Sequence, residues 1–249
     1  MLKATFDKNW FMSIRTSTAA EVNLICFPCG GGGASTFCSW QSLAAKVNIW
    51  ALKLPGRESR MTEAPLTSAT TLIKYIIDAL SPTLTMPFIF YGHSMGAGLA
   101  FQVILQLQKS KQSLPKLLIA SGREPPHCNY SHSVSHLEDH ALIAYLQELG
   151  GISGTIPNDK IFIKQYLTKI RADYQLNSSI PNVTPMPLPI MISIINGYDD
   201  PLVKAEKLPQ WAKHTNYSLH SRMLPGGHFF INEYFSDFIN EVAISIRRT

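Results

Sequence analysis

One serine stands in a sequence pattern that suits a catalytic nucleophile. Residues 92–96 read Gly-His-Ser-Met-Gly and fit the pattern Gly-x-Ser-x-Gly. The pattern is informative when a strand precedes it and a helix follows it, because the serine then lies on a tight turn at the amino end of the helix. Backbone N–H groups there favour a developing negative charge. The apolar run Phe88–Tyr91 predicts the strand, and Leu99–Leu107 continues a predicted helix. We therefore interpret Ser94 as a nucleophile, the alternative being a glycine-rich helix start with a capping serine.

His228 is the candidate general base. A serine hydroxyl is a weak nucleophile and needs a base, and the base needs an acid that orients it. With a serine at a strand-to-helix turn, the partners follow in the chain order serine, acid, histidine. His228 follows the predicted strand Tyr217–Leu224 and lies downstream of candidate acids. Most of the other seven histidines fall in residues 123–186. We expect His93, which precedes the serine, to be a packing residue.

Two adjacent aspartates are candidates for the acid. Asp199 and Asp200 both follow the predicted strand Pro189–Ile195, and spacing alone does not choose between them. Pro201 restricts the residue before it to an extended backbone. On that ground we favour Asp200 as the residue that orients His228, with Asp199 as a turn residue that faces solvent.

An acyl-transfer site also needs two N–H donors for the oxyanion. One donor is expected from Met95, the residue after the serine, and the other from the loop after an early strand. That loop, residues 28–33, reads Pro-Cys-Gly-Gly-Gly-Gly and follows the predicted strand Val22–Phe27; we call it the glycine loop. Glycines let the backbone approach a substrate carbonyl closely. We expect Gly30 to donate, with Cys29 as its competitor. The loop fits neither a P-loop nor a dinucleotide-binding pattern.

The cysteines do not predict a metal site. Cys26 and Cys29 form a lone Cys-x-x-Cys, whereas a zinc site of this kind needs a second pair at a suitable spacing. A thioredoxin-like motif would open a helix directly, but here four glycines follow. We expect buried thiols in a reducing compartment, no metal and no cofactor.

These candidate residues all follow predicted strands. Strands that alternate with helices predict parallel βαβ units, and strands that are apolar throughout predict a sheet covered on both faces. Ligands bind such sheets at the carboxyl ends of the strands. At most one edge strand is expected in residues 1–20. The other predicted strands are Asn48–Leu54 and Leu117–Ala120, and the other predicted helices are Phe37–Ala45, Ser68–Leu80 and Phe229–Ile246.

Residues 123–186 interrupt the alternation. The sequence predicts two helices there, His136–Leu149 and Asp159–Leu176, and then a proline-rich stretch, with no convincing strand between Ala120 and Pro189. We expect a single domain over residues 1–249, with a helical lid inserted at about 125–185 over the strand ends. An ordinary long crossover is the alternative.

The composition excludes several classes of protein. With 249 residues, 45% of them apolar and 16% charged, the chain is expected to form a large core. It has no run of about 20 apolar residues that could span a membrane, and no signal-peptide core. The net charge of +5 is scattered along the chain, unlike a nucleic-acid-binding arm. We expect a cytoplasmic monomer that binds neither nucleic acid nor membrane.

Several motifs give the chain a specific resemblance between about Val22 and Phe238. They are Phe-Pro-x-x-Gly-Gly at 27–32, Leu-Pro-Gly-Arg-Glu-x-Arg at 54–60, Gly-His-Ser-Met-Gly at 92–96, Ser-Gly-Arg at 121–123, Asp-Asp-Pro-Leu-Val at 199–203 and Pro-Gly-Gly-His-Phe-Phe at 225–230. With these motifs, in this order, the chain resembles the type II thioesterases of polyketide and nonribosomal peptide assembly lines.

The resemblance implies a fold, an activity and partners. The fold is the α/β-hydrolase fold, with a mostly parallel central sheet, helices on both faces and a helical lid. The activity is hydrolysis of acyl groups from the phosphopantetheine thiol of acyl- or peptidyl-carrier proteins. Carried over by position, the family's triad falls on Ser94, Asp200 and His228. One departure is that family members often have His-Ala where this chain has Cys29-Gly30, although the donors there are backbone groups.

Some alternatives stay open at this stage. Arg57, Glu58 and Arg123 lie in strand-end loops, where they either pair and brace the site or are solvated charges. We expect Trp40 to belong to the core. Two other functions remain: a serine esterase or lipase that acts on small soluble esters with the same triad, and a catalytically dead module that binds carrier proteins.

Overall fold

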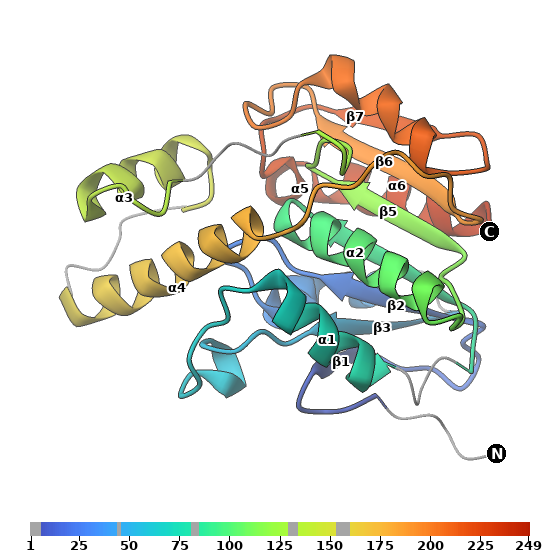
Figure 1. Cartoon of the computed structure of the whole chain (residues 1–249), viewed down its shortest axis with the longest axis horizontal. Coiled ribbons are helices and arrows are strands. Elements are labelled where there is room, and N and C mark those ends of the chain that lie inside the picture. Colours follow the sequence, from blue (N-terminus) through green and yellow to red (C-terminus); the bar gives the residue numbers. More distant parts are fainter. Residues whose placement is uncertain (1–5, 44–45, 81–84, 129–133, 153–159) are drawn as a thin grey trace.

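The described residues form a seven-stranded sheet with the order β1-β3-β2-β4-β5-β6-β7 (Figure 1). The computed structural model describes residues 6–43, 46–80, 85–128, 134–152 and 160–249. Edge strand β1 runs antiparallel to β3, and the other neighbours are parallel. The mostly parallel sheet and the early edge strand are as predicted. The strands are β1 (Phe11–Arg15), β2 (Val22–Phe27), β3 (Val47–Leu52), β4 (Phe88–His93), β5 (Leu117–Ser121), β6 (Met191–Gly197) and β7 (His220–Leu224).

Helices cover both faces of the sheet, and each face has its own apolar core. Successive side chains of a strand point to opposite faces, so in β2 Ile25 packs in one core and Leu24 in the other. Helices α1 (Ala69–Leu80) and α2 (Met95–Lys109) pack in the first core. The second core receives the 3₁₀ helix η1 (Ala34–Ser42) and the helix α6 (Phe235–Arg247). Strands buried on both sides explain the uninterrupted apolar runs in the sequence.

Several predicted boundaries differ from the structure, for example β7, which begins at His220 and not at Tyr217, and two of the differences are informative. The helix expected over Phe37–Ala45 is the 3₁₀ helix η1, which ends at Ser42; residues 44–45 lie outside the described residues. Its buried side chains recur every third residue, at Ala34, Phe37 and Trp40, which is the period of a 3₁₀ helix. The same spacing marks a 3₁₀ helix that we did not predict, η4 (Ala205–His214), which buries Leu208, Trp211 and His214.

The helix expected over Phe229–Ile246 is two helices. The short helix α5 (Phe230–Glu233) is separated from α6 by Tyr234, whose φ of −112° and ψ of 40° leave the helical region. The ring of Tyr234 packs against Gly226, where an added Cβ would lie 3.1 Å from it. The break therefore places an aromatic ring against the loop that carries His228.

Helices α3 (Asp139–Glu148) and α4 (Lys160–Ser178) lie together beyond the carboxyl ends of the strands (Figure 1). They pack on each other through Leu142, Leu146, Leu167 and Ile170. Both helices occur where the sequence predicted them, and the described residues between β5 and β6 form no strand. Among the helices that the structure describes, none combines the length and the apolar character needed to cross a membrane.

Candidate active site

Ser94 lies at the turn between β4 and α2. Its φ of 52° and ψ of −115° place it in a strained region that a non-glycine residue rarely adopts. The Ser94 N–H donates to the Ser121 carbonyl of β5 at 2.8 Å, which ties the turn to the neighbouring strand. The Ser94 hydroxyl makes no capping hydrogen bond to α2. The geometry therefore does not support the alternative of a helix-capping serine.

The two glycines around Ser94 are required by close backbone packing. A Cβ added to Gly96 would collide with the carbonyl oxygen of Phe27 in β2, and one added to Gly92 would collide with the backbone of Gly96. Glycine at both positions lets β2, β4 and the first turn of α2 approach each other. The pattern thus builds the tight turn, and the turn presents Ser94 at the strand ends.

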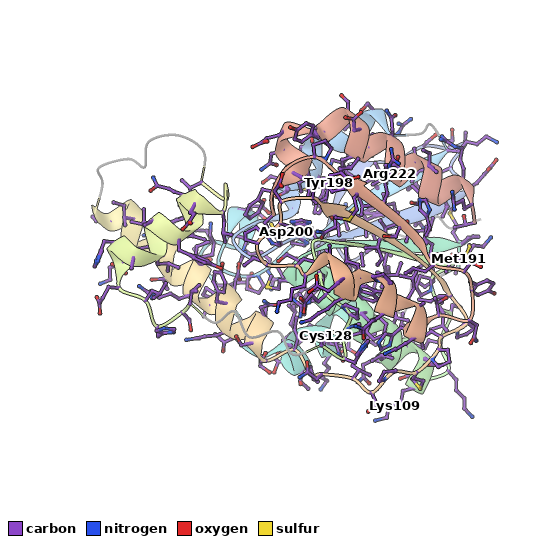
Figure 2. The ribbon with its side chains drawn as sticks, turned by 90° about the horizontal axis from the view of Figure 1, so that it is seen from above. Lys109, Cys128, Met191, Tyr198, Asp200 and Arg222 are labelled. Carbon is purple, nitrogen blue, oxygen red and sulfur yellow. The ribbon has the colours of Figure 1, made fainter. Side chains whose placement is uncertain are left out.

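His228 pairs with Asp200. The distance from His228 Nδ1 to Asp200 Oδ2 is 2.9 Å, and both residues are buried. The other carboxylate oxygen, Asp200 Oδ1, accepts the Leu202 N–H at 2.9 Å, so the carboxylate is held from two sides. Asp199 is exposed. In Figure 2, Asp200 lies where α3 and α4 meet the sheet, whereas Met191, at the start of β6, lies toward the far end.

His93 packs beneath His228. The ring centroids of the two histidines lie 5.0 Å apart, and His93 Nδ1 lies 3.0 Å from Ser121 Oγ. Burial lowers the pKa of His93 well below its ordinary value, and repulsion by His228 lowers it further. His93 is therefore a neutral ring at physiological pH. Trp40 is 3% exposed and packs against the rings of Tyr91 and Phe238 in the core.

A narrow cavity brings the candidate residues together. Its open volume is about 30 Å³, and its walls are formed by the strand-end loops, α2, α3 and α4. Ser94, Met95 and His228 meet there with both candidates of the glycine loop. The strand-end loops and α2 contribute Cys29, Gly30, Ser94, Met95, Leu202, His228 and Phe229. Helices α3 and α4, with Leu149 directly after α3, contribute Leu146, Leu149, Asp173, Tyr174 and Asn177.

The glycine loop offers a restricted choice of N–H donors. The Gly31 N–H already donates to Asp173 Oδ2 at 2.7 Å. Cys29 and Gly30 are the residues of the loop that line the cavity, so their amides are the remaining candidate donors. They are the same two positions that were proposed from the sequence.

The three charged residues of the strand-end loops brace the site. Arg57 and Arg123 are buried. Arg57 forms a bidentate pair with Asp173 of α4, and Arg123 Nη1 donates to Asn177 Oδ1 of the same helix at 2.6 Å. Glu58 accepts the N–H groups of Ala34 and Ser35 at the start of η1, at 3.1 and 2.8 Å. These three residues therefore brace the site, and the alternative that they are solvated charges was wrong.

Sequence reasoning missed the polar residues of α4 at the site. Asp173 and Asn177 are both buried, and with Ile170 they recur at the spacing of one helix face. A polar residue on an otherwise apolar helix face was the signal that could have found them.

Comparison with known proteins decides the family. A family model described as a thioesterase domain matches residues 22–247. The chain belongs to the thioesterase family. It is 30% identical to gramicidin S biosynthesis protein GrsT of Aneurinibacillus migulanus, over 96% of this chain and 94% of that protein. It is 32% identical to the medium-chain S-acyl fatty acid synthase thioesterase of Homo sapiens, over 92% of this chain and 88% of that enzyme.

A solved structure agrees with this family over nearly the whole chain. The type II thioesterase BorB from the borrelidin biosynthetic cluster superimposes with a TM-score of 0.86 at 28% identity, covering 97% of this chain and 99% of that one. The expected α/β-hydrolase type of fold and the resemblance to thioesterases are both confirmed. This thioesterase hydrolyses thioesters, as its family does.

Cys29 should be dispensable for the thioesterase activity. Its thiol is buried, and burial, aided by the charge of Asp173, raises its pKa to about 11. The thiol is then protonated at neutral pH and a poor nucleophile, while any oxyanion donor at this position is a backbone group. Cys29→Ala is expected to keep most of the kcat/KM for thioester hydrolysis. A loss comparable to that of Ser94→Ala would assign the thiol a chemical role.

Proposed function

We propose that this protein is a type II thioesterase that removes acyl groups from the phosphopantetheine thiol of carrier proteins in polyketide or nonribosomal peptide assembly lines. The observation that carries the proposal is the buried pair of Asp200 and His228, in which His228 lines one cavity with Ser94 and the two candidate donor residues of the glycine loop. Its biosynthetic setting is supported by GrsT, which matches the chain over nearly its full length.

The proposed reaction proceeds through an acyl-enzyme. Ser94 Oγ attacks the thioester carbonyl while His228 takes the hydroxyl proton. Asp200 orients the imidazole and stabilises its cation, and the N–H groups of Met95 and Gly30 bind the oxyanion. When the tetrahedral intermediate collapses, the C–S bond breaks and the leaving thiol takes the proton from His228. A water molecule deprotonated by His228 then attacks the acyl ester, which releases the carboxylic acid and restores Ser94.

We propose that α3 and α4 act as a lid within a single domain. Both helices contribute side chains to the cavity wall, on the side opposite the strand ends. The open volume of about 30 Å³ is far below the roughly 300–1,000 Å³ of ordinary ligand pockets. An acyl group on a phosphopantetheine arm therefore requires these helices to move outward before it can reach Ser94. The proposed lid spans about residues 125–185, of which 129–133 and 153–159 lie outside the described residues.

The partners in this proposal are acyl- or peptidyl-carrier proteins, and the place of action is the cytoplasm, where assembly lines synthesise their products. The carrier supplies the acyl group on a covalent arm. Binding energy from the protein part of the substrate is then available to promote reaction at the thioester. The proposal thus predicts a much higher kcat/KM for an acyl group on a carrier protein than for the same acyl group on a small leaving group.

The test compares one acyl group on three leaving groups: a phosphopantetheinylated carrier protein, N-acetylcysteamine and p-nitrophenol. The expected result is the highest kcat/KM for the carrier thioester. A higher kcat/KM for the p-nitrophenyl ester than for both thioesters, with the carrier thioester no better than the N-acetylcysteamine thioester, would instead identify an esterase for small esters. Carrier binding without turnover of any substrate would identify a dead binding module.

A further inference from the structure

A buried ion pair connects α4 to the loop after β3. Arg57 and Asp173 are 5% and 2% exposed. Arg57 Nη1 lies 2.7 Å from Asp173 Oδ2, and Arg57 Nη2 lies 2.6 Å from Asp173 Oδ1, which is a bidentate arrangement. Such a pair fixes the relative position of the two groups in both distance and orientation. The residues are separated by 116 positions in the chain, so the pair determines how α4 sits on the strand-end loops.

The same two side chains also bind the glycine loop. Asp173 Oδ2 accepts the Gly31 N–H at 2.7 Å, and Arg57 Nη1 donates to the Gly32 carbonyl at 2.7 Å. The Gly31 N–H belongs to the planar peptide group that joins Gly30 to Gly31. Asp173 therefore holds the peptide plane that directly follows the candidate oxyanion donor, the Gly30 N–H.

A glycine loop needs such an external anchor. Four consecutive glycines have wide conformational freedom, and inside the loop the Gly32 N–H donates to the Cys29 carbonyl at 3.1 Å; Asp173 and Arg57 add two contacts from outside it. An oxyanion donor is effective only when it is oriented before the charge develops, because reorienting it during the reaction costs free energy. The two side chains supply this orientation from outside the loop, and one of them belongs to α4.

We propose that Asp173 and Arg57 are positioning residues that set the oxyanion donor of the glycine loop and link it to the position of α4. This inference rests on the proposed function. When α4 lies against the strand ends, Asp173 holds the Gly31 N–H beside Gly30, which lines the same cavity as Ser94. When α4 moves outward, the loop loses this anchor. The oxyanion site is thus complete only while the contact between Asp173 and Gly31 holds, so the outward movement that admits the acyl group must spare this contact or be followed by its return before hydrolysis.

The primary test is Arg57→Lys. Lysine keeps the positive charge beside Asp173 but lacks the two-pronged geometry, so it cannot bind Asp173 bidentately and the Gly32 carbonyl together. Using the N-acetylcysteamine thioester, we expect kcat to fall by about 10²-fold, the typical cost of one oxyanion donor, with little change in KM. The pH profile of kcat/KM should stay unchanged, because His228 and Asp200 are untouched.

A second readout separates positioning from support of the fold. An acyl trifluoromethyl ketone forms a tetrahedral adduct on the serine and places an oxyanion in the same site. Its affinity should fall by the same factor as kcat/KM, while the affinity for the product acid stays the same. If Arg57→Lys does not fold, the neutral pair Arg57→Gln with Asp173→Asn replaces it, since this double variant leaves no unpaired buried charge.

The matched control is Asp139→Asn. It removes the ion pair between Asp139 and Arg171, which also involves α4 but lies toward solvent, since the Asp139 side chain is 64% exposed. This variant should hydrolyse the thioester as the wild type does. Equal losses of affinity for the ketone and the acid, or a shifted pH profile, would overturn the inference while leaving an active thioesterase. A wild-type protein that hydrolyses no thioester would overturn the proposed function, and this inference with it.

Discussion

Ser94→Ala is expected to abolish thioester hydrolysis and to leave the fold intact. Alanine removes only the hydroxyl oxygen, and the turn is held by the backbone bond to Ser121 and by the packing of Gly92 and Gly96. Without Oγ no acyl-enzyme can form, so only the background from binding and the oxyanion site remains. Steady-state rates on the acyl-carrier thioester measure the loss, and circular dichroism checks the fold.

A fluorophosphonate probe supplies the control for this variant. It should label the wild-type protein once per chain and should not label Ser94→Ala. Ser110 is exposed and follows Lys109, the last residue of α2, which Figure 2 shows well away from Asp200, so Ser110→Ala should label as the wild type does. Undiminished labelling of Ser94→Ala would show that another residue is the nucleophile.

Asp200→Asn is expected to lower kcat by about 10⁴-fold, the typical cost of losing the acid that orients a triad histidine. The amide of asparagine can present an N–H group to His228 Nδ1 and so favour the wrong tautomer. The Asp200 carboxylate is buried and contacts His228 at 2.9 Å, so solvent cannot take over its role.

The neighbouring residue offers a matched control. Asp199 carries the same charge one position away but is exposed, and its backbone N–H donates to the Gly226 carbonyl at 3.0 Å. Asp199→Asn keeps that backbone bond, so we expect kcat close to the wild-type value. Equal losses in the two variants, or a larger loss in Asp199→Asn, would reverse the choice between the two aspartates.

Local patterns account for what the sequence could predict. Strands β4 and β5 are buried along their whole length, so their apolar runs stood out and were located to within two residues. Ser94 was singled out as the candidate nucleophile for the same reason, because the strand, the turn and the helix around it are adjacent in the chain. Asp200 and His228 followed from the order of loops at the strand ends.

Contacts between distant segments account for what was missed. The pairing of Arg57 with Asp173 spans 116 positions, and no local pattern in either segment reveals it. The break at Tyr234 was missed because the residues on both sides of it have helical spacing. The 3₁₀ helix η4 contains Pro209 and too few apolar residues for a helical prediction, although its buried side chains recur every third residue.

The path of the acyl group tests the central claim most directly. The protein is mixed with a carrier that bears an acyl-phosphopantetheine group, quenched with acid at millisecond intervals, digested and analysed by mass spectrometry. The account predicts an acyl ester on the peptide that contains Ser94, which appears as the carrier thiol is freed and decays as the carboxylic acid is released. An acyl group found on Cys29 or on any other residue, or release of the acid with no adduct on Ser94, would contradict it.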